Sequence, residues 1–142
     1  MKIAICSDHG GYELKEYLKK ALKEYEIKDL GCFSKERCNH VEYAFKLSEY
    51  VVKEDLLGIA ICKSGIGMSI ACNKVKGIRC AKVNNVKEAI VTREDNNANV
   101  IAISGKMCKR KALKIIKAFI NTSFKNTEPY ISRVKQVDEY IK

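Results

Sequence analysis

Short apolar runs rich in β-branched residues alternate along this chain with amphipathic stretches, and this alternation constrains the fold more than any other feature. Such runs, when polar turns bound them, are typical of buried strands. The runs that predict strands are Lys2–Cys6, Glu26–Leu30, Leu57–Cys62, Gly77–Val83 and Val100–Ser104.

The stretches between these runs predict helices. In the first of them Leu14, Leu18 and Leu22 recur at helical spacing. Strands that alternate with helices are typical of βαβ units with right-handed crossovers around a parallel sheet. The sequence therefore predicts an α/β fold, a three-layer α/β/α Rossmann-like domain with about five parallel strands, and leaves the strand order open. The predicted helices are Tyr12–Tyr25, Tyr43–Lys53, Met68–Lys74, Val86–Glu94, Cys108–Asn121 and Ile131–Ile141.

Length, composition and charge narrow the class of protein. The 142 residues predict a single domain over 1–142, and 46% hydrophobic with 31% charged residues is a globular composition. A net charge of +10 favours anionic partners. Most lysines, as in Glu13–Lys23 and Lys109–Lys117, alternate with apolar positions and are expected on solvated helix faces. No nucleic-acid motif accompanies the charge, so we do not expect a nucleic-acid partner. No apolar run approaches the roughly 20 residues of a membrane span, so we do not expect a membrane partner either.

The seven cysteines are an odd number without a Cys-x-x-Cys pair or zinc-ligand spacing. They predict a reduced, cytoplasmic protein with no metal site. Several lie inside apolar runs, where a free cysteine packs as a small hydrophobic residue.

Ligands of parallel α/β folds bind outside the carboxyl ends of the strands. The segments that follow predicted strands there are Ser7–Gly11, Cys62–Ser69, the neighbourhood of Asn84-Asn85, and Ser104–Lys106. The second segment is the most informative, because backbone N–H groups of a glycine-bearing turn before a helix can face an anion. The loop alone fits equally well an ordinary tight turn with glycine at positive φ.

Three side-chain groups near these loops suggest chemistry. Cys62, beside a helix start and Lys63, suits a base or nucleophile, although a cysteine at a strand end is more often packed. Asp8 can accept sugar hydroxyls and His9 can bind phosphate or move a proton, while Asp8 can also cap a helix near Gly11. The polar run Thr92–Asn99 is expected to be either a solvated loop or a segment that folds over a site across a dimer interface.

Taken in order, four segments resemble the ribose-5-phosphate isomerase B and galactose-6-phosphate isomerase family. They are Ser-Asp-His-Gly-Gly, Cys-Lys-Ser-Gly-Ile-Gly-Met-Ser-Ile-Ala-Cys-Asn-Lys, Gly-Ile-Arg-Cys-Ala and Arg-Glu-Asp-Asn-Asn-Ala-Asn-Val. The resemblance covers nearly the whole chain. It implies a homodimer or tetramer with active sites shared between subunits, which interconverts aldose and ketose phosphates without metal or organic cofactor. The C-terminal helix, about 131–141, is then expected to pack on a partner subunit.

Matched position by position, the resemblance assigns roles to individual residues. Cys62 matches the base that moves a proton between C1 and C2 through a cis-enediolate. The loop from Lys63 to Gly67 matches the oxyanion hole. Within this loop, Ser64 contributes its hydroxyl, and Gly65, Ile66 and Gly67 contribute their backbone. Asp8 matches a residue that holds substrate oxygens, His9 one that binds the phosphate, and Asn96 one that binds substrate. Lys106 stands where a phosphate-binding arginine is usual, and Arg133 matches an arginine expected to reach the partner's site.

The chain also departs from the family pattern. Asp95 stands where the family commonly has the histidine that opens the sugar ring, and it is expected to replace that histidine only with a suitably placed proton and a raised pKa. Asn39-His40-Val41 replace Asp-Tyr-Pro, Pro129-Tyr130 replace the tail's first Arg and His, and Lys63 replaces a glycine.

The favoured function is interconversion of ribose 5-phosphate and ribulose 5-phosphate. One alternative is a galactose or allose 6-phosphate isomerase, alone or as one of two unlike chains, which a comparison of pentose and hexose turnover separates. Another is a non-catalytic phosphosugar-binding homologue, which would bind without turnover.

Overall fold

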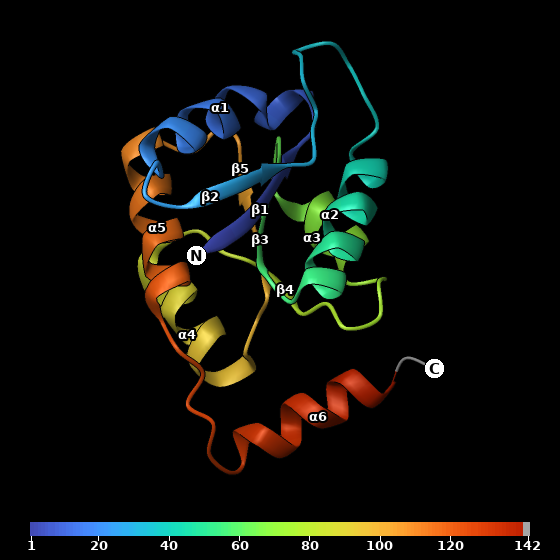
Figure 1. The fold of residues 1–142 in the computed structure, drawn as a ribbon, viewed down its shortest axis with the longest axis vertical. Coiled ribbons are helices and arrows are strands. Elements are labelled where there is room, and N and C mark those ends of the chain that lie inside the picture. Colours follow the sequence, from blue (N-terminus) through green and yellow to red (C-terminus); the bar gives the residue numbers. More distant parts are fainter. Residues whose placement is uncertain (141–142) are drawn as a thin grey trace.

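The computed structural model describes residues 1–140 and contains one five-stranded parallel sheet (Figure 1). Its strand order is β2-β1-β3-β5-β4, so β3 lies at the centre between β1 and β5. This arrangement confirms the predicted α/β class and supplies the strand order that the sequence left open. The strands are β1 (Lys2–Ser7), β2 (Glu26–Asp29), β3 (Leu57–Cys62), β4 (Cys80–Lys82) and β5 (Val100–Ser104).

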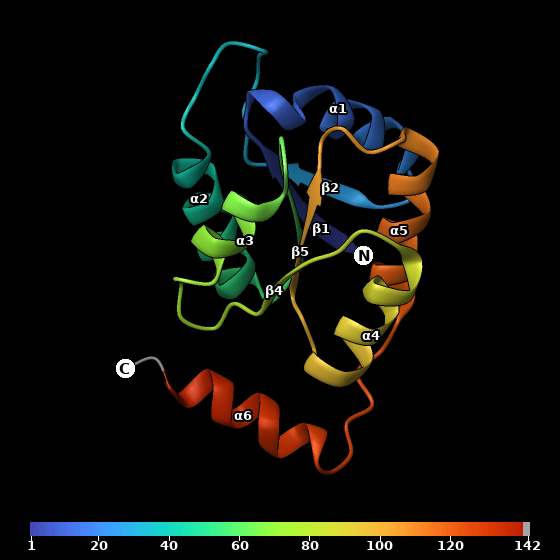
Figure 2. The ribbon, with the colours of Figure 1, turned by 180° about the vertical axis from the view of Figure 1, so that it is seen from behind.

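Helices cover both faces of the sheet, as Figures 1 and 2 show from opposite sides. Because strand side chains alternate between faces, isoleucines such as Ile59 and Ile61 pack beneath α1, α4 and α5. Small residues such as Ala60, together with Cys62, pack beneath α2 and α3. Cys62 therefore belongs to the α2/α3 face. The helices on the two faces are α1 (Tyr12–Ala21), α4 (Val86–Asn96) and α5 (Lys109–Asn121), and α2 (His40–Glu54) and α3 (Ile66–Cys72).

Several helix boundaries differ from those predicted. Helix α1 ends at Ala21 instead of Tyr25, whose N–H donates to the Leu22 carbonyl in a turn. Helix α2 begins at His40 instead of Tyr43, because the Asn39 side chain caps it by accepting a hydrogen bond from the N–H of Val41.

The polar run Thr92–Asn99 is not a solvated loop throughout. Its first half continues α4 as far as Asn96, and Thr92 and Ala98 are buried. The edge strand β4 is also shorter than the predicted run Gly77–Val83. Both edge strands carry a lysine, Lys28 on β2 and Lys82 on β4.

The C-terminal helix α6 (Tyr130–Tyr140) projects below the α/β body in Figure 1, and none of its residues is buried. The guanidinium of Arg79 binds both carboxylate oxygens of Asp138, at 2.7 and 2.8 Å, and holds α6 near the start of β4. Ile141, the last residue of the predicted helix, lies outside the described residues. Within residues 1–140, no helix combines the length and the hydrophobicity needed to cross a bilayer.

Lys15 is an exception to the expectation of solvated lysines, because its side chain is fully buried. Its ammonium lies 2.6 Å from the Asp29 carboxylate, which also binds Lys19 at 2.8 Å. Burial alone would raise the pKa of Asp29. The hydrogen bonds from the two lysines and from the N–H of Gly31 outweigh this effect, so the pKa lies below its usual value. Asp29 thereby anchors the segment that leads from β2 toward the carboxyl edge of the sheet.

Candidate active site

The segments that follow β1, β3 and β5 meet at the carboxyl edge of the sheet. The N–H of Asp8 donates to the carbonyl of Ile61, and that of Gly105 donates to the carbonyl of Cys62, at 2.8 Å. The hydroxyl of Ser104 donates to the carbonyl of Lys63, at 2.6 Å. These bonds bring together three of the predicted loops, with Asp8, His9, the segment 62–67 and Lys106.

Cys62 ends the central strand and is 5% exposed. The N–H of Gly65 donates to its sulfur, at 3.2 Å. This geometry needs glycine, because φ at Gly65 is 79° and a Cβ there would lie 2.9 Å from the carbonyl carbon of Ile103. A backbone donor therefore contacts the atom that carries negative charge once the thiol has lost its proton.

Ser64 is exposed beside Cys62. Its hydroxyl oxygen accepts a hydrogen bond from the N–H of Ile66, at 3.1 Å. Since a hydroxyl both accepts and donates, its proton remains available to an oxygen in the site. Ile66 itself is 54% exposed, so its side chain does not fill the space beside Cys62.

Asp8 both caps a helical turn and faces the site. Its Oδ1 accepts hydrogen bonds from the N–H groups of Gly10 and Gly11, at 2.9 and 3.2 Å, which confirms the expected capping role. Among the described residues, no hydrogen bond uses Oδ2. That oxygen is the one left to accept a ligand hydroxyl.

His9 is oriented by the segment that precedes α2. The N–H of Cys38 donates to Nδ1, at 3.2 Å, so in the neutral imidazole the proton lies on Nε2. The Cys38 sulfur lies 3.9 Å from the same nitrogen, and burial raises the pKa of this thiol. Nε2 is therefore the donor that His9 can present to an anion.

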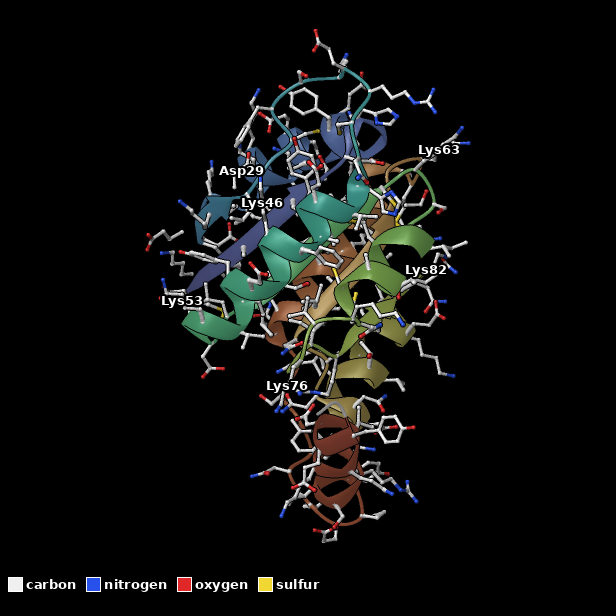
Figure 3. All side chains as sticks on the ribbon, turned by 90° about the vertical axis from the view of Figure 1, so that its right-hand side faces the viewer. Asp29, Lys46, Lys53, Lys63, Lys76 and Lys82 are labelled. Carbon is white, nitrogen blue, oxygen red and sulfur yellow. The ribbon has the colours of Figure 1, made fainter. Side chains whose placement is uncertain are left out.

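Lys63 and Lys106 are exposed at this edge of the sheet. Lys63 lies beside the upper end of α3 in Figure 3, on the side where the β3 loop emerges. Both ammonium groups add positive charge near the loop, where an anionic substrate group would approach.

His40 was missed as a candidate by the sequence analysis. It is partly buried at the start of α2, and a Cβ built at Gly67 would lie 2.6 Å from its Nε2. The imidazole thus packs directly against the loop that follows Cys62. The Asn39 cap was the signal available in the sequence, since it starts a helix at the carboxyl edge of the sheet.

The remaining predicted site residues lie at the opposite edge of the subunit. The N–H of Gly58, near the start of β3, donates to the carbonyl of Asn99, three residues beyond Asn96. Cys62 ends the same strand, so the length of β3 separates the two groups. Asn96 and Arg133 line a cavity between α6 and β4, and Asp95 lies 2.8 Å from Lys125. One chain therefore does not bring these three residues to Cys62.

Known proteins share this sequence and this fold. The family model described as Ribose/Galactose Isomerase matches residues 3–137. Ribose-5-phosphate isomerase B of Mycobacterium tuberculosis is 34% identical, over 99% of this chain and 90% of its own length. A ribose 5-phosphate isomerase structure from Thermotoga maritima is 36% identical with a TM-score of 0.93, over 97% of each chain. Ribose-5-phosphate isomerase B from Mycoplasma genitalium, solved with bound ribulose 5-phosphate, is 32% identical with a TM-score of 0.92, over 98% of this chain and 95% of that one.

The chain belongs to the ribose/galactose isomerase family. Its activity is accordingly that of a sugar-phosphate isomerase, and the matched segments include the loop that holds Cys62.

Proposed function

We propose that the protein interconverts ribose 5-phosphate and ribulose 5-phosphate, with Cys62 as the base. The observation that carries the proposal is the Gly65 N–H that contacts the Cys62 sulfur in a loop flanked by Asp8 and His9. The substrate class is supported by the relatives from Mycobacterium tuberculosis and Mycoplasma genitalium, which are ribose 5-phosphate isomerases.

The reaction is a proton transfer between neighbouring carbons. The Cys62 thiolate removes the proton from C2 of the open-chain aldose, and the electron pair forms the double bond of a cis-enediolate with negative charge on O1. The Ser64 hydroxyl and the backbone N–H of Gly67 in the same loop stabilise that charge. The proton returns to C1, and the proton of the O2 hydroxyl passes to O1, so that C2 becomes the ketone and C1 carries a hydroxyl.

The residues around Cys62 hold the two ends of the substrate. The free Oδ2 of Asp8 accepts a sugar hydroxyl, and Nε2 of His9 donates to the phosphate. Lys106 attracts the phosphate as a point charge, without the paired hydrogen bonds of an arginine. Lys63 adds a second cation.

We also propose that the site is completed by a second copy of the chain. Asn96, Arg133 and Asp95 lie at the opposite edge of the subunit, where they can reach a partner's Cys62 loop but not their own. Helix α6 has no buried residue and exposes Ile131, Val137 and Tyr140, which suits packing against a second subunit. The compartment we propose is the cytoplasm, where seven free thiols stay reduced.

The test compares the turnover of ribose 5-phosphate by the wild type, Cys62→Ala and Cys108→Ala. Cys108 is exposed at the start of α5, so its variant is a matched loss of a thiol. We expect Cys62→Ala to lose activity by roughly 100-fold or more and Cys108→Ala to keep it. Equal activity of both variants would exclude Cys62 as the base, and faster turnover of galactose or allose 6-phosphate would reassign the substrate. Binding of ribose 5-phosphate by the wild type without turnover would indicate a non-catalytic homologue.

A further inference from the structure

Isomerisation of an aldose phosphate needs an open chain, but pentose and hexose phosphates exist mainly as rings. In the ring of ribose 5-phosphate the C4 oxygen is bonded to C1. Opening breaks this bond, and the ring oxygen must receive a proton while the anomeric hydroxyl loses one. A side chain that supplies the first proton acts as a general acid.

Asp95 occupies the family position linked above to ring opening, but a lysine engages its carboxylate. This carboxylate lies 2.8 Å from the ammonium of Lys125. The hydrogen bonds of Lys125 with Asp95 and Tyr130 raise the pKa of Lys125, so the lysine stays charged. A carboxylate oxygen that accepts a hydrogen bond from an ammonium is not free to present a proton to a ring oxygen.

Histidine is the side chain best suited to give a proton near neutral pH, and this chain has two. His9 is held at Nδ1 by the N–H of Cys38 and serves the phosphate in the proposed function. His40 is the other. Within the part of the chain that the structure describes, its side chain makes no hydrogen bond or ion pair, so both ring nitrogens are available to a ligand.

The position of His40 brings it to the reacting end of the sugar. Its Nε2 packs against Gly67, two residues after the Gly65 whose N–H contacts the Cys62 sulfur. Gly67 has no Cβ, which leaves room for the imidazole; an alanine there would collide with Nε2. His40 is only partly buried, and neither ring nitrogen is among the fully buried polar atoms without a partner, so solvent reaches the ring.

We propose that His40 is the general acid that opens the sugar ring, an inference that rests on the isomerase activity proposed above. Protonated His40 gives its proton to the ring oxygen as the bond from that oxygen to C1 breaks. The electron pair of the anomeric O–H bond forms the aldehyde, and the hydroxyl proton passes to water. Neutral His40 then regains a proton from solvent. Proton donation for ring opening thus lies in the same subunit as Cys62.

The test follows ring opening separately from isomerisation. 2-Deoxyribose 5-phosphate has no C2 hydroxyl and cannot become a ketose, but its two anomers interconvert through the open chain. NMR exchange spectroscopy measures that interconversion at an analogue concentration that inhibits ribose 5-phosphate turnover. We expect the wild type to accelerate it and His40→Gln to lose about 100-fold of the acceleration.

A matched control and a rescue separate chemistry from folding. Glu42→Gln alters an exposed charge in the same first turn of α2 and should keep the acceleration. In His40→Ala, added imidazole should restore part of the acceleration, which a purely structural role of His40 would not allow.

Three results would overturn the inference. The first is a wild type that turns over ribose 5-phosphate without accelerating anomer exchange. The second is full acceleration by His40→Gln. The third is loss of acceleration in Asp95→Asn while His40→Gln keeps it. The first leaves the proposed function standing, whereas absence of ribose 5-phosphate turnover would overturn both.

Discussion

Arg79 and Asp138 form a bidentate ion pair across 59 residues of sequence, with both carboxylate oxygens within 2.8 Å of one guanidinium nitrogen. The Arg79 side chain is 16% exposed, and its Nε donates to the carbonyl of Asn97. This arginine therefore joins α6, which carries Arg133, to the end of α4, which carries Asn96. The pair fixes the relative position of two predicted substrate-binding residues.

Asp138→Asn should release α6 without unfolding the α/β body, because the pair is the only ion pair between α6 and the body within residues 1–140. Limited trypsin digestion should cut after Arg133 and Lys135 several times faster, while the urea midpoint changes little. Glu139→Gln, which removes an exposed pair with Lys135 inside α6, is the control and should leave digestion unchanged. Equal protection of both variants would show that other contacts hold α6.

Asp29→Asn should destabilise the fold far more than Lys15→Met. The asparagine leaves the fully buried Lys15 ammonium without its closest counterion, at an expected cost of about 3 kcal/mol. The methionine fills a similar volume, and Asp29 keeps Lys19, so we expect less than about 1 kcal/mol. Urea unfolding at neutral pH measures both, and a reversed order would contradict this account of the pair.

The same carboxylate should contribute to acid sensitivity. Its pKa in the folded protein lies below its ordinary value, so Asp29 stabilises the fold above about pH 4, and this contribution is lost as pH falls through the folded-state pKa. The difference in unfolding free energy between the wild type and Asp29→Asn should therefore shrink steadily below about pH 4. A constant difference down to pH values near 2 would mean that the charge of Asp29 is not what stabilises.

Gly65→Ala should lower activity more than its effect on stability explains. Gly65 and Gly77 both have positive φ, 79° and 90°, so alanine strains either backbone by about 1–2 kcal/mol. Only Gly65 donates to the Cys62 sulfur, and we expect its variant to lose roughly 100-fold in kcat. Gly77→Ala is the control for backbone strain, with near-normal kcat and a smaller loss in Tm, because its Cβ would meet only the Val52 side chain, at 3.3 Å. Equal kcat values would argue against the role of the loop in charge stabilisation.

Two inactive variants should restore activity when they are combined in one assembly. Cys62→Ala lacks the proposed base and Arg133→Ala lacks a residue proposed to reach the partner's site, so a mixed dimer contains one site with neither change. Refolding an equal mixture should recover about a quarter of the wild-type activity. If no activity returns although mixed dimers form, the site is not shared in this way.

The sequence predicted the features that local pattern controls. The isoleucine-rich runs predicted strands β1, β3 and β5 nearly to the residue, because parallel strands that are buried on both faces read as near-continuous apolar runs. The loops after these strands were predicted for the same reason, and the structure brings Asp8 and Cys62 to one edge.

What was missed depends on contacts between distant segments. The burial of Lys15 follows from Asp29 on a neighbouring strand, and its helix gave no sign of it. His40 looked like a departure from a motif until its ring was found against Gly67. The continuation of α4 through Asp95 was obscured by a run of polar residues that usually form loops.

The two outer strands have a consequence for how the protein avoids unwanted association. The β2 edge has four residues and the β4 edge has three, and each bears a lysine. An approaching chain would find few backbone groups to pair with and a charge beside them, which disfavours continuous sheets and fibrils. The second copy proposed above would then be met through helical surfaces, where side-chain complementarity selects the correct partner.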